Sequence, residues 1–312
     1  MPKIVVVGSS NTDMVVQTPH IPAPGETVLG GEFIMAAGGK GANQAVAAAR
    51  LGAEVTFVAR VGQDVFGEQA LAGFRREGLD TRHVVTDPEA VSGVALIFVD
   101  AGGENSIAVA PGANARLSPD DVRRAREVIE AADVLLLQLE IPLETVQMAA
   151  EVAHRAGVRV ILNPAPAPAD PLPAELLTCV DVLTPNESEA GLLIGTKVAD
   201  TSDAELAARR LIERGVGAVI VTLGARGALA VTPEGQQLVP SFPVDVVDTT
   251  AAGDAFNGGL AVALAGKKSL AEAIRFASAC GALAATRMGA QPSLPAADEV
   301  AAFWMEREGK ST

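Results

Sequence analysis

The stretch DVLLLQLEIPLETVQMAAEVAHRAGVRVILN, residues 133–163, decides the fold. It begins with the continuous apolar run 133–138, continues with a helical pattern over 143–156, and ends with a second apolar run, 158–163. Short apolar runs without polar alternation are typical of strands buried on both faces of a parallel sheet. A helix between two such strands indicates a right-handed crossover. This stretch therefore predicts an α/β fold of three layers, with a mainly parallel central sheet flanked by helices.

The same alternation of strand and helix continues on both sides of this stretch. Further strands are expected at 3–8, 54–60, 180–184 and 218–222. Helices are expected at 41–51, 66–77, 120–130 and 203–214, and then at 253–264, 269–285 and 297–308. Because no repeat, low-complexity tract or linker interrupts the pattern, we expect residues 1–312 to form a single domain.

Two segments lack a crossover helix. The first, 11–35, contains several prolines between short β-prone pieces, and the second, 91–111, has two β-prone runs separated by Asp100-Ala101-Gly102-Gly103. The second pattern is a hairpin signal. We expect the two segments to form a small antiparallel sheet that acts as a lid over a site. The alternative is an edge extension of the main sheet with no such role.

Composition and charge exclude several classes of protein. Among the 312 residues 49% are hydrophobic, so the chain can form a large core and is not disordered. The formal net charge of -14 argues against nucleic acid and anionic membranes as partners. No apolar run is long enough to span a bilayer, and no signal peptide is recognisable at the N-terminus. The two cysteines and three histidines suggest neither disulfides nor a zinc site, so we expect a cytoplasmic protein.

Two common glycine motifs are absent. A Walker A loop requires a glycine at position 34, where this chain has Ile34. The first strand ends in Gly8-Ser9-Ser10, which is not a dinucleotide-binding fingerprint. These observations argue against a P-loop NTPase and against a Rossmann dehydrogenase.

The strongest local signal is DTTAAGDAF, residues 248–256, between a β-prone run and an apolar helix. Small residues at a helix N-terminus let an anion approach backbone N–H groups, so Ala251, Ala252, Gly253 and Asp254 are the candidate anion site. Asp254 is the candidate general base. The alternative is that Asp254 is an ordinary carboxylate in the first turn of a helix.

Two more motifs point to a ligand rich in hydroxyl groups. In AGGKGANQ, residues 37–44, Gly39 permits an unusual backbone geometry, and Lys40 and Asn43 offer hydrogen-bonding groups. In Asn11-Thr12-Asp13, after the first strand, Asp13 can accept two hydroxyl groups. A solvated lysine loop and an ordinary Asx turn are the alternatives.

Three further strand ends carry polar residues. In TPNESE, residues 184–189, Asn186 and Glu189 are candidates to hold water and Mg²⁺ near phosphates, although an N-cap with first-turn glutamates is the alternative. The segment TLGARG, residues 222–227, is a tight loop suited to nucleotide contact, and Glu140 follows the run 133–138.

Together these motifs resemble the ribokinase branch of the PfkB carbohydrate kinase family over essentially the whole chain. GGKGANQA, residues 38–45, is similar to the N-terminal signature of that family, and residues 248–256 are similar to its C-terminal signature. Asn11-Thr12-Asp13, Leu139-Glu140, residues 163–166 and residues 289–293 favour the ribokinase branch. One departure is visible, because many members have a glycine where this chain has Ala251.

The resemblance implies a ribokinase-like fold and ATP-dependent phosphorylation of the ribose 5-hydroxyl, with Asp254 as base and residues 251–254 as anion hole. By position, the sugar site consists of Asn11, Asp13, Gly39, Lys40, Asn43, Glu140 and Asp254. The nucleotide site consists of Asn186, Glu189, Thr222, Gly224, Arg226, Gly227, Gly253 and Ser278. A monovalent cation, usually K⁺, is implied beside Asp248, Thr250, Ala284, Arg287, Gly289 and Ser293, largely through backbone oxygens. Mg²⁺ with ATP and a homodimer formed through the lid are implied as well.

Two alternatives remain open at this point. One is another kinase of the same family, acting on a ketose, a 2-keto-3-deoxygluconate-type sugar acid or a nucleoside. The other is a sugar or nucleotide sensor without catalytic activity on the same fold.

Overall fold

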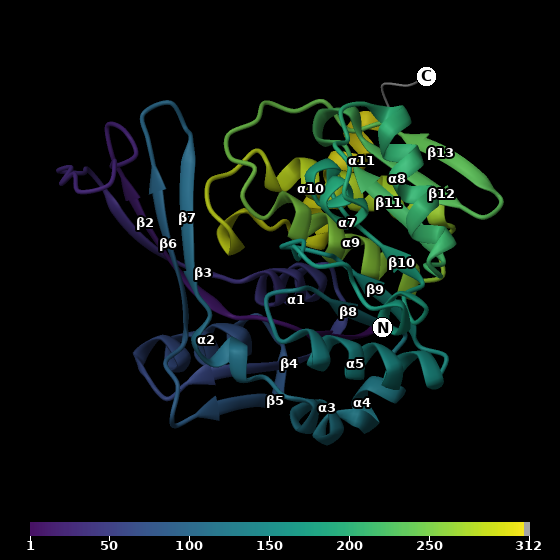
Figure 1. The fold of residues 1–312 in the computed structure, drawn as a ribbon, viewed down its shortest axis with the longest axis horizontal. Helices are drawn as coiled ribbons and strands as arrows, with labels where there is room; N and C mark the ends of the chain where they lie inside the picture. The colour runs from purple at the N-terminus through teal and green to yellow at the C-terminus, as the bar shows by residue number, and fades with distance from the viewer. Residues whose placement is uncertain (309–312) are drawn as a thin grey trace.

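The structure, a computed structural model, describes residues 1–308 and is built around a nine-stranded sheet (Figure 1). Its strand order is β13 (Gly235–Val239), β12 (Ala228–Thr232), β11 (Ala218–Thr222), β10 (Val182–Leu183), β9 (Arg159–Leu162), β8 (Val134–Leu137), β1 (Lys3–Val7), β4 (Glu54–Gly62) and β5 (Asp80–Asp87). All pairs from β11 to β5 are parallel, whereas β12 and β13 are antiparallel additions. The predicted mainly parallel sheet is confirmed.

The unit from which the prediction began is present as β8, α5 (Leu143–Arg155) and β9. β8 and β9 pair in parallel, with Leu135 opposite Val160 and Leu137 opposite Leu162. Every residue of the two strands is apolar and buried except the exposed Arg159 at the start of β9, so the continuous runs mark strands buried on both faces.

Two apolar cores lie on opposite faces of the sheet, because successive strand residues point to opposite sides. Ile4 and Val6 belong to one core, and Val5 and Val7 to the other. The first core includes α1 (Lys40–Arg50), α2 (Val65–Arg76), α9 (Ala252–Ala265), α10 (Leu270–Ala284) and α11 (Ala297–Glu308). The second includes α3 (Pro119–Arg124), α4 (Arg126–Glu130), α5, α6 (Ala174–Leu177), α7 (Glu187–Ile194) and α8 (Thr201–Glu213). These are the three predicted layers.

Some elements differ from the sequence expectations. The helix expected at 120–130 is divided into α3 and α4 at the buried Ala125, whose φ of -93° and ψ of 4° interrupt the helix. The strand expected at 180–184 is reduced to the two residues of β10, although the Thr184 N–H still donates to the Leu162 carbonyl and its hydroxyl donates to Asn257 Oδ1. The β12–β13 hairpin had no counterpart in the expected strands.

The small sheet has the order β3 (Phe33–Gly38), β2 (Asn11–Gln17), β6 (Gly93–Val99) and β7 (Asn105–Ala110). The outer pairs are antiparallel, but the central pair β2–β6 is parallel, so the fully antiparallel expectation is wrong for that pair. The reason is that β2 follows β1 and β6 follows β5, and these two strands run in the same direction in the main sheet. Figure 1 shows the small sheet beside the main body of the molecule.

Within residues 1–308, no helix combines the length and the apolar character that a bilayer crossing requires.

Candidate active site

The candidate site lies where the carboxyl ends of several parallel strands meet the N-termini of α1 and α9. Ser9 follows β1, Glu140 follows β8, and Asn163 follows β9. Ligands usually bind at this edge of a parallel sheet, outside the carboxyl ends of its strands. The small sheet starts from the same edge, since β2 begins four residues after β1 ends.

The N-terminus of α9 is open. Its N-cap residue Ala251 has a φ of 59°, and no side chain caps the helix. Among the described residues, no acceptor is recorded for the N–H groups of Gly253 and Asp254. A Cβ at Gly253 would meet no protein atom within 4 Å. Free N–H groups beside open space suit an anionic group, and the helix dipole adds to this preference.

Asp254 stands in the first turn of α9, but its carboxylate does not cap that helix. Its side chain is directed to α1, where Oδ2 accepts from Asn43 Nδ2 at 2.9 Å and Oδ1 accepts from Gln44 Nε2 at 3.0 Å. Only 7% of Asp254 is exposed. Burial raises the pKa of Asp254, while Lys40 and the two amide donors oppose this effect. A buried carboxylate with a raised pKa is the usual property of a general base.

Lys40 and Glu140 lie next to this carboxylate. Burial opposes the charged form of Lys40, but the negative charges of Asp254 and Glu140 outweigh it and raise the pKa of the ammonium group. Glu140 Oε2 accepts from the Lys40 backbone N–H at 3.0 Å and from Ser9 Oγ at 2.5 Å. Lys40 therefore stays charged among the acidic groups of the site.

Asp13 on β2 completes the acidic cluster. Burial, followed by the charges of Glu140 and Asp254, raises the pKa of Asp13 to about 6. A Cβ at Gly38 would lie 2.1 Å from Asp13 Oδ2, so a larger residue there would displace the Asp13 carboxylate. Gly39 has a φ of 89°, which glycine adopts without strain.

Asn11 is oriented by a residue outside the predicted set. Its Oδ1 accepts from Asn114 Nδ2 at 2.8 Å, and Asn114 also accepts from the Ser10 N–H. The Asn11 amide protons have no recorded partner within residues 1–308. The structure thus brings together all seven residues of the predicted sugar set.

Asn186 and Glu189 begin α7 as a capping box. Asn186 Oδ1 accepts from the Glu189 N–H, and Glu189 Oε2 accepts from the Asn186 N–H, both at 2.8 Å. The helix cap expected as the alternative role of Asn186 and Glu189 is therefore present. Burial raises the pKa of Glu189, and Glu189 is near enough to Lys40 and Asp254 for their charges to act on it.

The remaining nucleotide residues form a loop next to this cap. Thr222 forms a β-bridge with Asn186, and Arg226 pairs with Glu187. Gly224 and Gly227 both have positive φ. A Cβ at Gly227 would come within 2.1 Å of the Val239 carbonyl oxygen, whereas Gly224 faces open space.

Ser278, the last residue of the predicted nucleotide set, is buried in α10, and no hydrogen bond joins it to the others in the described chain.

The predicted cation residues lie on two segments, 248–250 and 284–293, which Asp248 joins through hydrogen bonds. Asp248 Oδ1 accepts from the N–H and the hydroxyl of Thr250, and Oδ2 accepts from the Gly289 N–H at 2.8 Å. Burial raises the pKa of Asp248, but these hydrogen bonds outweigh it and lower the pKa. Arg287 pairs with Glu299, and its N–H donates to the Ala284 carbonyl. Ser293 bonds to Ala290 rather than to Asp248.

Sequence reasoning gave no role to a group of buried polar residues that support the site, although three of them, Gln44, Asn163 and Thr184, stand in motifs quoted above. They are Ser9, Gln44, Asn114, Gln138, Asn163, Thr184 and Asn257. One signal could have found three of them. Gln138, Asn163 and Thr184 each follow an apolar strand directly, where a polar side chain faces the ligand edge of the sheet.

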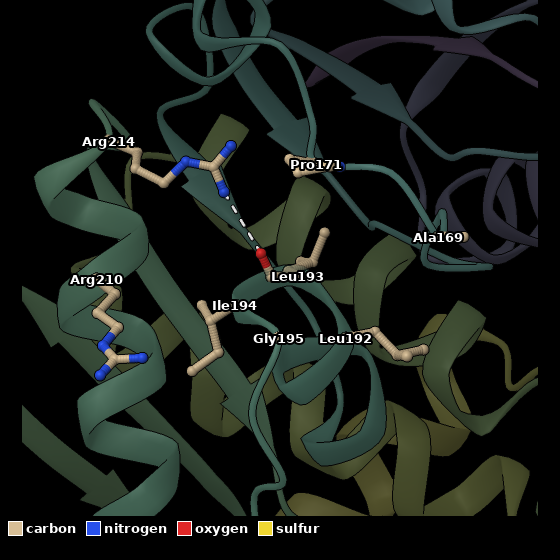
Figure 2. Close-up of a pocket in the computed structure, with 8 residues that line it drawn as sticks. All are labelled: Ala169, Pro171, Leu192, Leu193, Ile194, Gly195, Arg210 and Arg214. Carbon is tan, nitrogen blue, oxygen red and sulfur yellow. Dashed lines mark hydrogen bonds between the residues drawn. The ribbon is translucent and has the colours of Figure 1, made fainter.

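Two surface hollows lie elsewhere. One, of about 410 Å³, is lined by Pro171, the end of α7, and Arg210 and Arg214 (Figure 2). The other, of about 390 Å³, lies near Asp133 and Lys267, by the amino ends of β8 and β9. Arg214, which lines the first hollow, donates hydrogen bonds to the carbonyls of Leu172 and Leu193 and so links these two parts of the chain. Neither hollow includes a residue of the predicted site.

Comparison with known proteins agrees with this fold. The profile described as pfkB family carbohydrate kinase matches residues 1–297. The chain is 46% identical over 300 residues to a ribokinase of Haemophilus influenzae, covering 96% of this chain and 97% of that protein. It is 39% identical over 296 residues to a deoxyribokinase of Salmonella typhi, covering 95% and 96%. The structure of Arabidopsis thaliana ribokinase complexed with ribose and ATP superposes with a TM-score of 0.89 at 35% identity, covering 97% of this chain and 98% of that one. With its family profile, its relatives and its fold in agreement, the chain belongs to the pfkB family of carbohydrate kinases.

Proposed function

We propose that this protein phosphorylates ribose at the 5-hydroxyl with ATP as phosphoryl donor. The observation that carries the proposal is the buried Asp254 carboxylate, next to the unpaired N–H groups at the open N-terminus of α9. A proton acceptor and an anion site are the two parts that phosphoryl transfer to an alcohol needs. A full-length relative named ribokinase supports ribose as the acceptor.

In the proposed reaction, the sugar hydroxyl oxygen attacks the γ-phosphorus of ATP in line with the bond to ADP. Asp254 takes the hydroxyl proton, the new O–P bond forms, and the bond between the γ-phosphorus and the bridging oxygen breaks. Each carboxylate oxygen of Asp254 accepts one amide N–H and keeps a lone pair for the proton. The Gly253 and Asp254 N–H groups stabilise charge on the transferred phosphoryl oxygens.

The sugar is proposed to lie among Asp13, Asn43 and Glu140. Asn43 Oδ1 is buried and has no hydrogen-bond partner, so it can accept from a substrate hydroxyl. The Asp13 carboxylate can accept two hydroxyl groups, and the free Asn11 amide protons can donate to a sugar oxygen. These groups favour a neutral polyol over a sugar acid, whose carboxylate would meet the negative charges of Asp13 and Glu140.

ATP is proposed to extend from α9 towards Asn186, Thr222 and the loop 224–227. Mg²⁺, when bound, neutralises phosphate charge. Oxygen ligands suit this ion, and Glu189 is the candidate to hold it directly or through water. The Glu189 carboxylate uses only Oε2 in the capping box, which leaves its second oxygen for this purpose.

A monovalent cation, proposed to be K⁺, fits beside Asp248. Its carboxylate remains ionised and orders Thr250 and Gly289 around the turn that precedes α9. A cation there would fix the backbone that leads into the anion site. Asp248, Thr250, Ala284, Arg287, Gly289 and Ser293 are the proposed surroundings.

The small sheet is proposed to act as a lid and to form a homodimer. Phe33 and Phe98 flank Val16, and Met35 and Leu96 flank Met14, so the four flanking side chains share one face. All four are exposed. Asp13 lies on the opposite face, because neighbouring strand residues alternate. An exposed apolar face on a sheet with open edges is suited to pairing with a second copy.

The free thiols Cys179 and Cys280 fit the proposed cytoplasmic location.

The activity is tested by ADP formation from ATP with a panel of ribose, 2-deoxyribose, fructose, 2-keto-3-deoxygluconate and nucleosides. We expect ribose to give the highest kcat/KM. A better result with another sugar would reassign the substrate, and no sugar-dependent ADP formation would favour a sensor. Asp254→Asn is expected to bind ribose and to lose about 10²–10⁴-fold in turnover. Near-normal turnover of that variant would reject Asp254 as the base.

A further inference from the structure

Gln44 contacts the proposed base without belonging to the proposed sugar or nucleotide sites. We propose that Gln44 is a positioning residue, which holds the Asp254 carboxylate in its ionised form and in a fixed orientation before substrate binds. This inference rests on the proposed role of Asp254.

The hydrogen bonds of Gln44 leave its side chain one orientation. Nε2 donates to Asp254 Oδ1 and to Asn163 Oδ1, both at 3.0 Å, and Oε1 accepts from Gln138 Nε2 at 2.6 Å. Gln44 is 0% exposed. Since both amide protons are used within the protein, Gln44 has no donor left for a ligand. A flipped amide would direct its oxygen at the carboxylate and lose both bonds.

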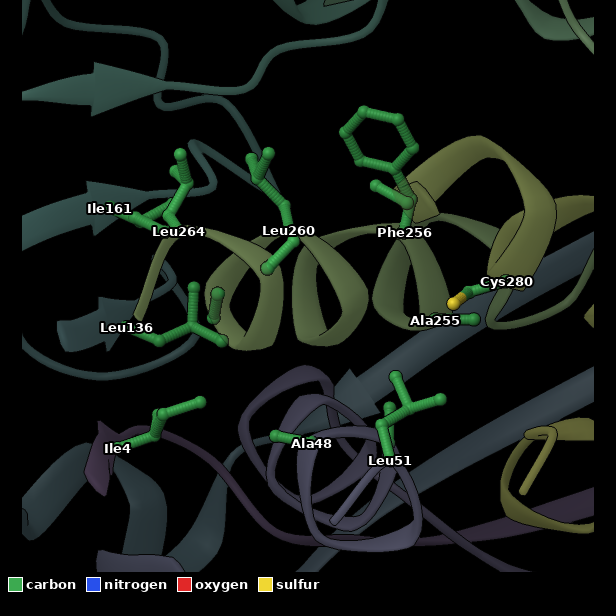
Figure 3. Close-up of a cluster of buried hydrophobic side chains, with 14 of the residues drawn as sticks. Ile4, Ala48, Leu51, Leu136, Ile161, Ala255, Phe256, Leu260, Leu264 and Cys280 are labelled. Carbon is green, nitrogen blue, oxygen red and sulfur yellow. The ribbon is translucent and has the colours of Figure 1, made fainter. Parts of the chain in front are cut away.

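Close packing of α1 against α9 lets the Gln44 side chain on α1 reach the Asp254 carboxylate on α9. A Cβ at Gly258 would lie 2.6 Å from Ala47 Cβ and 3.1 Å from the Gln44 carbonyl oxygen. Gly258 is one helical turn beyond Asp254 on α9, so the two helices are in close contact one turn from the carboxylate that Gln44 holds. Figure 3 shows Ala48 of α1 and Leu51, the residue that follows α1, beneath α9, where Ala255 and Leu260 are labelled.

The same network continues to the anion site. Asn163 Nδ2 donates to the Thr184 carbonyl, and the Thr184 hydroxyl donates to Asn257 Oδ1 at 2.6 Å. Asn257 Nδ2 then donates to the Gly253 carbonyl at 2.8 Å. Buried hydrogen-bonded networks of this kind resist rearrangement, because a broken bond leaves a polar group unpaired; one acceptor of this network, Gln138 Oε1, already lacks a protein partner. Gln44 therefore joins the base to the loop that carries the N–H groups.

The charges around Asp254 show why a donor is needed there. Glu140, Asp13 and Glu189 repel its negative charge, and burial acts in the same direction. Lys40, Asn43 and Gln44 favour the charged form. Asn43 is also proposed to bind the sugar, whereas Gln44 has no donor left for a ligand. Its hydrogen bond to the Asp254 carboxylate is therefore expected to stay unchanged when substrate binds.

The test is the pH dependence of kcat in Gln44→Met, which keeps the side-chain length and removes both donors. Loss of a hydrogen bond to a carboxylate raises its pKa, so we expect the acid limb of kcat to move up by about one pH unit. At pH 7 we expect kcat to fall by about 10-fold or more, with a smaller change in KM for ribose. Thr145→Val is the matched control, since Thr145 is fully buried on α5 and donates at 2.7 Å to the Leu117 carbonyl. It should lose stability and keep the acid limb of the parent protein.

An unchanged acid limb in a folded Gln44→Met protein would overturn the inference, and so would an equal shift in Thr145→Val. If Gln44→Met does not fold, Gln44→Glu serves the same purpose. A second carboxylate beside Asp254 must share a proton with it, so the acid limb should rise by more than one unit, and an unchanged limb would again overturn the inference. Asp254→Asn is assayed in parallel. Activity in that variant rejects the proposed base, whereas inactivity with an unshifted Gln44→Met profile rejects only the role of Gln44.

Discussion

Asn43 donates a hydrogen bond of 2.9 Å to the carboxylate of Asp254, although 211 positions separate the two residues in the chain. The carbonyl oxygen of the same amide is buried and has no partner. One side chain therefore holds the proposed base and keeps a buried acceptor that no protein group uses. Together with Gln44, which donates to the other carboxylate oxygen, Asn43 fixes the orientation of the Asp254 side chain from α1.

Gly253→Ala separates a ligand role from a structural one. Because a Cβ at this position would meet no protein atom within 4 Å, we expect the free energy of unfolding to change by less than about 1 kcal/mol. The methyl group would occupy the proposed phosphate position, so kcat/KM for ATP should fall by about 10²-fold. Thermal unfolding and steady-state kinetics measure the two effects.

Gly235→Ala is the control, since a Cβ there is equally free of contacts and Gly235 lies on the distant β13. Full activity in Gly253→Ala would show that the open N-terminus of α9 does not hold phosphate.

Asp13→Asn should stabilise the fold and impair sugar use. The folded-state pKa of Asp13 is raised from 3.8 to about 6, so the unfolded chain loses this proton first as pH rises. The contribution of Asp13 is therefore most favourable below pH 4 and is lost between about pH 4 and 6. At pH 7.5 the variant should be more stable by about 1–3 kcal/mol, with no gain at pH 4.

Urea unfolding at the two pH values measures this difference, and KM for ribose should rise because a neutral amide accepts hydroxyl protons less strongly. Equal stability of the two proteins at pH 7.5 would contradict the burial and repulsion found around Asp13.

Potassium should activate the enzyme through the segment around Asp248. We expect higher activity of the parent protein in potassium chloride than in tetramethylammonium chloride. In Asp248→Ala the K⁺ concentration for half-maximal activation should rise about tenfold, because the variant loses charged hydrogen bonds to Thr250 and Gly289. Initial rates across a series of ATP concentrations provide the measurement. Identical rates in both salts at every ATP concentration would exclude the cation.

Leu96→Glu should dissociate the proposed dimer. Leu96 is 48% exposed on β6, on the face of the small sheet opposite Asp13. A buried carboxylate at an apolar interface is costly, so sedimentation should give the mass of one 31.8 kDa chain for the variant and about twice that for the parent protein. Leu206→Glu on α8, where Leu206 is 46% exposed, is the control and should not change the mass. A monomeric parent protein would remove this role of the lid.

Local patterns predicted most of the fold for an identifiable reason. Continuous apolar runs such as Val134–Leu137 are strands because both faces are covered, and that is visible in the residues themselves. Gly52 and Gly78 have positive φ and end α1 and α2, as glycines after a helical pattern predict. The parallel β2–β6 pair could not be found in this way, because its direction depends on how two distant strands are placed in the main sheet.

The site shows the same division. The sequence by itself determined which residue types can act, namely the glycine turn before Lys40, the small residues before Asp254 and the polar ends of the strands, because short-range geometry restricts these positions. Only the tertiary structure decided what each group does: that Asp254 turns away from its own helix, that Gln44 holds it, and that the pKa of Asp13 rises to about 6. The reason is physical. Hydrogen bonds, burial and charge act over a few ångströms in space, and the residues that meet at this site come from positions 9 to 289 of the chain.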